Sequence, residues 1–236
     1  MESFITGTFI EECKNRFLCL VKVKKETHLC YVASSARLEN FLELKGKRVL
    51  LMINQGNKTR TDYTLFAVKQ NAKYIVLNLA VANKFLADLL RSEYTKRIEF
   101  IREKIVNLDY KCDLYITTTP PVLVEAKSII SDKETVAFPS VIGDRAMKQF
   151  NALYNALEQG YRVRYCLVLL TPTIISLIAN DSAKEFYMGL VRAMEAGMSV
   201  EIYRIRNTRK LRFYLERDYQ IERDFENDFL RKVVTE

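Results

Sequence analysis

Histidine is almost absent from this chain, whose 236 residues include only His28. That residue, in "KETHLCYV", reads as an ordinary surface side chain at a strand edge, so the sequence argues against Ser-His or Cys-His catalysis and against sites built from several imidazoles. The five cysteines are odd in number, widely spread and never spaced as C-x-x-C, which argues against disulfides and zinc. Any catalytic chemistry would therefore fall to carboxylates and lysine.

Long apolar runs and breaker residues are also scarce. No stretch approaches the roughly 20 apolar residues of a membrane span, and the first residues lack the pattern of a signal peptide. With only 7 Gly, 4 Pro and 49% hydrophobic residues, the chain has the composition of one large or two small globular domains. We expect a cytoplasmic protein with no membrane partner.

The net charge of +8 is unevenly distributed. Residues 1–85 hold 14 Lys and Arg against 7 Asp and Glu, whereas residues 86–236 hold 23 against 22. A basic surface attracts polyanions, nucleic acid above all, although a solvated face that keeps the protein soluble is the simpler explanation of a charge excess.

Residues 1–80 read as a string of short strands separated by polar turns. The predicted strands cover 4–12, 16–24, 28–34, 47–54 and 62–69. Five short strands in this length predict an OB-like β-barrel that binds nucleic acid. Phe17, Tyr31 and Tyr63 are interleaved, as stacking or core aromatics, with the basic residues Arg16, Lys22, Lys24, Lys47, Arg48, Lys58 and Arg60. Arg16, Lys58 and Arg60 are the barrel residues predicted to contact nucleic acid.

From residue 81 to residue 236 the pattern is that of an α/β domain. Apolar spacing predicts two helices, or one broken helix, between Leu79 and Ile105. Strands at 112–117 and 122–130, a helix at 143–159, a strand at 164–171, a helix capped by Asp181 or Ser182 and a strand at 198–205 follow. At least one parallel crossover is expected, so the chain is α/β in its second half and α+β overall.

A charged pair interrupts the second of these strands, in "VLVEAKSII". Alternation places Glu125 and Lys127 on one face, and a hairpin centred on Thr119 places Asp113 opposite Glu125. Two carboxylates at that distance repel unless a proton or cation lies between them, and oxygen ligands suit Mg²⁺ or Mn²⁺. The three residues are the catalytic candidates.

Further residues complete this candidate site. Glu103, on the predicted preceding helix, is a third metal carboxylate beside Asp113 and Glu125. Arg145 and Lys148, three residues apart on one helix face, are candidates for binding the phosphates of nucleic acid. The Glu-x-Lys spacing also occurs at Glu12 and Glu43, so the alternative is a structural salt bridge on a half-solvated strand.

Several segments resemble the sugar fermentation stimulation protein family. They are "NRFLCLVKV", "YIVLNLAVANKFL", "CDLYI" with "VLVEAKSI", "AFPSVIGDRAMKQFNAL" and "SAKEFYMGLVRAMEAGMSVEIYRI". The resemblance implies an OB-like domain followed by a mixed-sheet domain of the PD-(D/E)xK restriction-endonuclease type, with DNA as partner. It also implies Asp113 and Glu125 as metal carboxylates and Lys127 as the catalytic lysine. Since nuclease-like domains often work in pairs, it allows a homodimer.

Three hypotheses follow. The first is a DNA-binding protein with Mg²⁺- or Mn²⁺-dependent phosphodiesterase activity, with RNA as an alternative substrate. The second is a non-catalytic DNA-binding or regulatory protein that keeps a vestigial nuclease fold. The third is an interaction module unrelated to nucleic acid.

Overall fold

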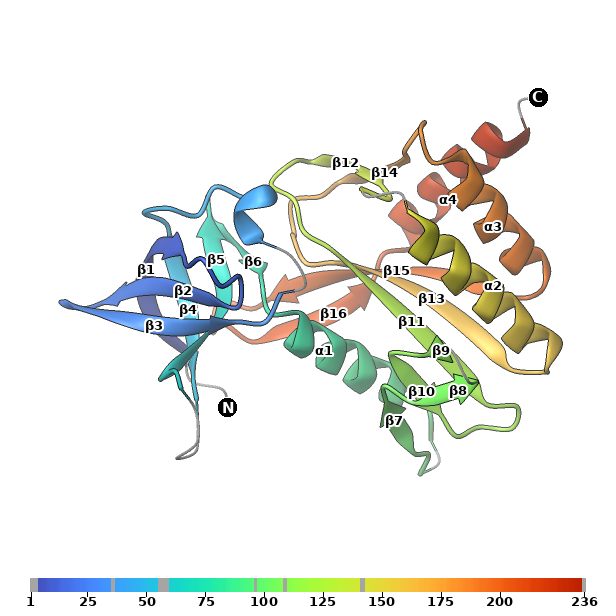
Figure 1. The fold of residues 1–236 in the computed structure, drawn as a ribbon, viewed down its shortest axis with the longest axis horizontal. Coiled ribbons are helices and arrows are strands. Elements are labelled where there is room, and N and C mark those ends of the chain that lie inside the picture. Colours follow the sequence, from blue (N-terminus) through green and yellow to red (C-terminus); the bar gives the residue numbers. More distant parts are fainter. Residues whose placement is uncertain are drawn as a thin grey trace.

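A computed structural model describes residues 4–34, 37–54, 60–95, 97–107, 110–140 and 143–234. Two sheets organise the chain, a barrel at one end and a mixed sheet flanked by helices at the other (Figure 1). Within the described ranges, no helix is long and apolar enough to cross a membrane.

The N-terminal sheet closes into a barrel, as expected. Its elements are β1 (Phe4–Glu12), β2 (Leu18–Val23), β3 (Glu26–Val32), the 3₁₀ turn η1 (Leu38–Asn40), β4 (Arg48–Ile53), β5 (Tyr63–Gln70) and β6 (Lys73–Val76). The strand order is β3-β2-β1-β4-β5-β6, and a parallel pairing of β3 with β5 closes the barrel. All five predicted strands are present, and β6 adds a hairpin partner to β5.

Local chemistry explains two details of this barrel. A Cβ on Gly7 would lie 2.5 Å from Val21 Cγ1, so only glycine lets β1 approach β2 this closely. The buried Glu12 carboxylate accepts the backbone N–H groups of Leu38 and Glu39, both at 3.0 Å, and thereby anchors η1 to the end of β1.

The second domain is built on a six-stranded mixed sheet. Its elements are α1 (Leu79–Ser92), β7 (Phe100–Arg102), β8 (Ile105–Asn107), β9 (Tyr110–Lys111), β10 (Leu114–Ile116), β11 (Val122–Ile129), β12 (Thr135–Phe138), α2 (Asp144–Glu158), β13 (Arg162–Leu169), β14 (Ser176–Ala179), α3 (Lys184–Glu195), β15 (Ser199–Asn207), β16 (Phe213–Arg217) and α4 (Tyr219–Val234). The sheet order is β16-β15-β13-β11-β10-β7.

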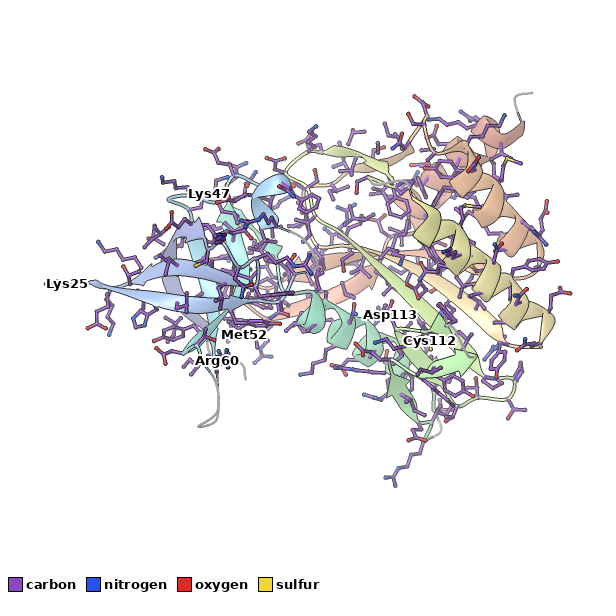
Figure 2. The ribbon with its side chains drawn as sticks, in the orientation of Figure 1. Lys25, Lys47, Met52, Arg60, Cys112 and Asp113 are labelled. Atoms are coloured by element: carbon purple, nitrogen blue, oxygen red, sulfur yellow. The ribbon has the colours of Figure 1, made fainter. Side chains whose placement is uncertain are left out.

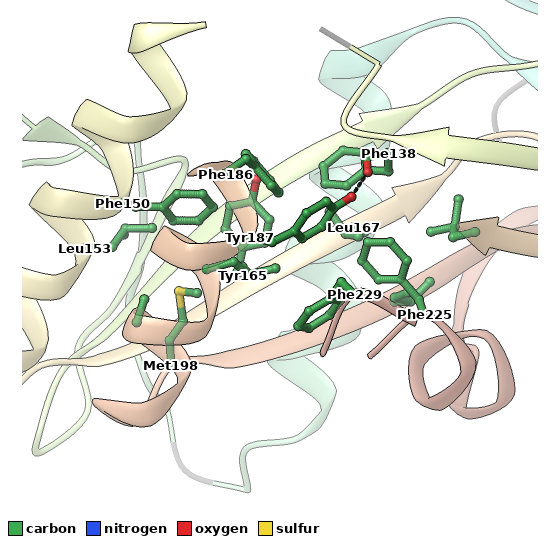
Figure 3. Packing of buried hydrophobic residues seen from close by; sticks show 14 of the residues in the cluster. Phe138, Phe150, Leu153, Tyr165, Leu167, Phe186, Tyr187, Met198, Phe225 and Phe229 are labelled. Atoms are coloured by element: carbon green, nitrogen blue, oxygen red, sulfur yellow. Dashed lines mark hydrogen bonds between the residues drawn. The ribbon is translucent and has the colours of Figure 1, made fainter. Parts of the chain in front are cut away.

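The centre of this sheet is parallel and its flanks are antiparallel. Strands β11, β13 and β15 run parallel and are linked through α2 and α3, which confirms the predicted crossover. One face packs on α2, α3 and α4 around an aromatic cluster in which the Tyr187 and Phe229 rings stack at 5.6 Å (Figure 3). The Tyr187 hydroxyl donates to the Phe138 carbonyl in the same cluster. The opposite face packs on α1 and on the barrel.

Two sequence-based predictions about helices were wrong. The helix after Leu79 ends at Ser92, and the segment predicted as its continuation forms β7, because Phe100–Arg102 pairs with β10 at the sheet edge. Helix α3 is preceded by Ala183 without a side-chain cap, since Asp181 instead contacts Lys232 at 2.5 Å. Pairing with a distant strand or helix overrode the local signal in both places.

Candidate functional site

The β10–β11 hairpin has the register expected from the sequence. Leu114 pairs with Val124, and Ile116 pairs with Val122. Extending this register by one residue places Asp113 opposite Glu125, at the start of the hairpin and next to the buried Cys112 (Figure 2). The charged residue that interrupts the apolar strand β11 therefore faces a second carboxylate on the neighbouring strand.

Glu125 is a buried carboxylate with both oxygens engaged. The residue is only 4% exposed and lies in β11 beside Tyr165 of β13. Oε2 accepts a hydrogen bond from the Tyr110 hydroxyl at 2.7 Å, and Oε1 accepts from Lys127 Nζ at 2.8 Å. Because an unpaired buried charge is strongly destabilising, Tyr110 and Lys127 are what hold this carboxylate in the sheet.

Asp113 lies on β10's side of the hairpin and is exposed to the negative charge of Glu125 on β11. Its Oδ2 accepts the backbone N–H of Ala126 at 2.8 Å. Burial, followed by the negative charge of Glu125, raises the pKa of Asp113 to about 6. Burial and then the same Glu125 charge raise the pKa of the Tyr110 hydroxyl well above its ordinary value, so Tyr110 remains a donor. Negative charge is therefore concentrated between β10 and β11.

Lys127 lies two residues beyond Glu125 on the same face of β11. Its side chain is 35% exposed, so the ammonium group bridges the buried carboxylate and solvent. This is the salt bridge that the sequence offered as the alternative to catalysis. The same contact also places a cation at the carboxylate pair, where it can act on a phosphate.

Glu103 is not on a helix, which corrects the sequence-based prediction. It follows β7 in a turn, with φ at +51°, and its carboxylate is 70% exposed. Lys111 Nζ contacts it at 2.8 Å, and the hydrogen bond and charge of that lysine lower the pKa of Glu103. Glu103 and Asp113 line one small cavity between α1 and the sheet, together with Asn83 and Arg102.

The carboxylates do not form a complete three-residue metal site. Among the residues that the structure describes, no three His, Cys, Asp or Glu side chains gather closely enough to hold a metal ion. Asp113 and Glu125 stand together, while Glu103 is turned toward Lys111. Sequence reasoning did not find Tyr110, because that residue belongs to no recognisable spacing.

The predicted nucleic-acid residues occupy different parts of the molecule. Lys148 is exposed on α2, which also includes Arg145, whose side chain lies outside the described part of the chain. Arg16 lies over the Phe17 ring at 4.7 Å on the barrel, and Arg60 precedes β5, far from Asp113 (Figure 2). Lys58 lies outside the described residues. The structure thus groups Asp113, Glu125 and Lys127 and leaves the barrel cations apart from them.

An OB barrel followed by a restriction-endonuclease-like mixed sheet defines the class of this protein. Family models match residues 12–77 as "SfsA N-terminal OB domain" and residues 78–210 as "Sugar fermentation stimulation protein RE domain". The chain belongs to the sugar fermentation stimulation protein family.

Known members of the family resemble the chain over most of its length. The sugar fermentation stimulation protein homolog of Natranaerobius thermophilus is 28% identical over 227 residues, which cover 88% of this chain and 90% of that protein. The homolog of Enterococcus mundtii is 28% identical over 218 residues, covering 86% and 87%. The SfsA structure of Pyrococcus furiosus, solved in complex with Ca²⁺, aligns with a TM-score of 0.74 at 19% identity, over 92% of this chain and 96% of that one. At this identity the likeness shows a shared fold.

Proposed function

We propose that this chain is a DNA-binding protein whose second domain hydrolyses phosphodiester bonds with a divalent metal. The observation that carries the proposal is the arrangement of Asp113 and Glu125 face to face, with Lys127 in contact with Glu125. Two hard oxygen donors beside a lysine form the minimal set for metal-assisted phosphodiester hydrolysis. DNA is the expected substrate, and RNA is the alternative.

The donor set fits Mg²⁺ or Mn²⁺. Both are bound through one or two carboxylates plus water and substrate oxygens. Burial and then the charge of Glu125 raise the pKa of Asp113, and a cation would relieve the second of these two effects. The relative from Pyrococcus furiosus was solved with Ca²⁺, another oxygen-seeking divalent ion. Asp113 and Glu125 would hold the metal, and Glu103 would be an outer carboxylate on the Asp113 side, since Glu103 and Asp113 line one cavity whereas Glu125 does not line it.

The residues around the carboxylates have separable roles in this proposal. When bound, the metal would supply Lewis-acid activation of the phosphate and of a water molecule. Lys127 would leave Glu125 Oε1 to orient the attacking water and to stabilise charge on the phosphate. Tyr110 would keep Glu125 in position through the second oxygen. Arg145 and Lys148 of α2 would bind flanking phosphates.

The barrel, up to about residue 80, would hold the nucleic acid. Its β2–β3 surface exposes Phe17, Leu29 and Tyr31 at about 40% each, and Arg16 lies over the Phe17 ring. Exposed aromatics beside cations suit a single strand, because every base has a face that can stack. Arg16, Lys58 and Arg60 are the barrel cations of this proposal.

A cleavage screen tests the catalytic part. Single-stranded, duplex and branched DNA and RNA would be incubated with wild-type protein in Mg²⁺ or Mn²⁺, alongside Asp113→Asn, Glu125→Gln and Lys127→Met. We expect metal-dependent cleavage by the wild type and a loss of at least 100-fold in each variant, the order of magnitude of removing one group from a catalytic site. If folded wild-type protein cleaved none of these substrates, the proposed phosphodiesterase activity would be rejected.

A second function, DNA binding without catalysis, is favoured by one observation. Both oxygens of Glu125 already have protein donors, so the carboxylate is neutralised without any metal. This hypothesis predicts DNA binding that weakens steeply with salt and is unchanged by EDTA. A strict requirement of binding for Mg²⁺ or Mn²⁺ would count against it.

A further inference from the structure

A cationic groove that no aromatic ring lines lies on the outer face of the barrel. It has a volume of about 400 Å³ and is lined by Thr6 and Thr8 of β1, Lys22 of β2, Lys24 of the following turn and Arg48 of β4. We call it the Lys22–Arg48 groove. The sequence placed these cations among the basic residues of the barrel, and the structure brings them together in one groove.

Strand register aligns the side chains of this groove. Thr8 pairs with Lys22 on one side and with Arg48 on the other, so the three form a row across β2, β1 and β4. All three are exposed. Neighbouring strands are about 4.8 Å apart, so the Cα atoms of Lys22 and Arg48 are roughly 10 Å apart, with the Thr8 hydroxyl between their side chains. Lys24, in the turn after β2, lines the same groove.

Among the described residues, no carboxylate pairs with the groove cations. No acidic side chain lines the groove, and Lys22, Lys24 and Arg48 make no side-chain hydrogen bond or ion pair within the described part of the chain. By contrast, two arginines of the second domain, Arg164 and Arg204, form ion pairs with carboxylates at 2.7 Å. A row of like charges without carboxylates raises the local positive potential and favours an external anion.

The side chains that line the groove indicate which groups of a nucleic acid would bind there. The groove offers two hydroxyls and three cations but no aromatic ring, whereas Phe17 and Tyr31 belong to the β2–β3 surface. Without a ring, bases cannot stack, so the contacts would be with phosphate oxygens and would not depend on sequence. A duplex, whose phosphates are denser than those of a single strand, fits best.

Strand β1, which lines the groove, also contacts the second domain. Phe4, two residues before Thr6 on β1, contacts the Phe213 ring at 5.8 Å at the start of β16. The turn that leads into β16 carries Arg209 and Lys210, both exposed.

We propose that the Lys22–Arg48 groove binds the phosphate backbone of duplex DNA, independently of base sequence. The proposal rests on DNA as the partner in the proposed function, but it does not depend on catalysis at Asp113 and Glu125. Figure 2 places Lys25, at the tip of the β2–β3 hairpin that follows Lys24, far from Asp113.

The test compares two triple variants with the same net charge. The groove variant is Lys22→Gln, Lys24→Gln and Arg48→Gln; the control is Lys14→Gln, Lys73→Gln and Lys133→Gln, three exposed lysines elsewhere. Binding of a fluorescent duplex of two unrelated sequences, and of oligo(dT), would be measured between 50 and 300 mM salt, about the range in which counterion release dominates.

We expect the groove variant to reduce the slope of log affinity against log salt by about 2 to 3 for both duplexes, since each phosphate contact contributes about 0.9. The control should change the slope by less than about 1. A charge-preserving variant, Lys22→Arg, Lys24→Arg and Arg48→Lys, should keep the wild-type slope, and equal thermal midpoints would show that all variants fold.

Several results would overturn the proposal. They are an equal loss in the control, an unchanged slope in the groove variant, a loss confined to oligo(dT), a defect seen with anionic lipid vesicles instead of DNA, and absence of duplex binding by the wild type. Failure of the proposed catalysis is distinguishable from failure of the groove proposal. In that case Glu125→Gln and the wild type would show the same cleavage, while the groove variant would still lose duplex binding.

Discussion

The Tyr110 hydroxyl donates a 2.7 Å hydrogen bond to Oε2 of Glu125, across a buried boundary between β9 and β11. Tyr110 is 7% exposed and Glu125 is 4% exposed, so water cannot replace either partner. This contact leaves Oε1 as the oxygen that Lys127 shares, and it sets the direction in which the carboxylate faces.

Removal of that hydroxyl should destabilise the protein. A hydrogen bond to a buried charged group contributes about 1.5–3 kcal/mol, so Tyr110→Phe should lower the free energy of unfolding by that amount in a urea titration. Tyr115→Phe is the matched control, since the Tyr115 ring lies against Lys104 and its hydroxyl makes no hydrogen bond in the described structure. Equal stability of the two variants would show that Glu125 does not depend on Tyr110.

Stability should fall as pH rises from about 4 to about 6. The pKa of Asp113 is raised to about 6 from 3.8, so in this window the folded protein keeps a proton that the unfolded chain has released. This costs up to about 3 kcal/mol at neutral pH. Asp113→Asn should therefore be more stable than the wild type at pH 7, and the difference should disappear near pH 4. A stability difference between Asp113→Asn and the wild type that did not change with pH would contradict the raised pKa of Asp113.

Divalent metal should stabilise the folded protein through Asp113 and Glu125. With Mn²⁺ at 100 times its dissociation constant, the gain is about 2.7 kcal/mol, visible as a rise in thermal midpoint. Asp113→Asn and Glu125→Gln should lose the rise, whereas Glu103→Gln should keep most of it because Glu103 faces Lys111. If Glu103→Gln also lost the rise, Glu103 would be a full ligand.

A second buried ion pair should matter for stability alone. Arg164 donates to Glu201 and Glu93 and thereby joins β13, β15 and the end of α1. Arg164→Met would leave Glu201, which is 4% exposed, without its cation and should cost about 3–5 kcal/mol in denaturant unfolding. Arg206→Met breaks the exposed pair with Glu216 and should cost less than about 1 kcal/mol. Similar costs would mean that burial of the Arg164 network contributes little.

Local pattern was sufficient for the barrel strands and for the β10–β11 hairpin. Strict alternation along β2 and the symmetry of the hairpin about Thr119 depend on the period of a strand, so the facing of Asp113 and Glu125 followed from counting residues. The parallel crossover from β13 to β15 followed from the order of strand, helix and strand.

Tertiary contacts decided the rest. Phe100–Arg102 has apolar spacing compatible with a helix, yet it forms β7 because it pairs with β10 at the sheet edge. Glu103, which follows β7, is therefore not on the predicted helix. Tyr110 reaches Glu125 from fifteen residues away, and Lys22 and Arg48 lie on either side of Thr8 of β1. Such pairings depend on which strands become neighbours, and the free energy of long-range burial, absent from any local window, determines that choice.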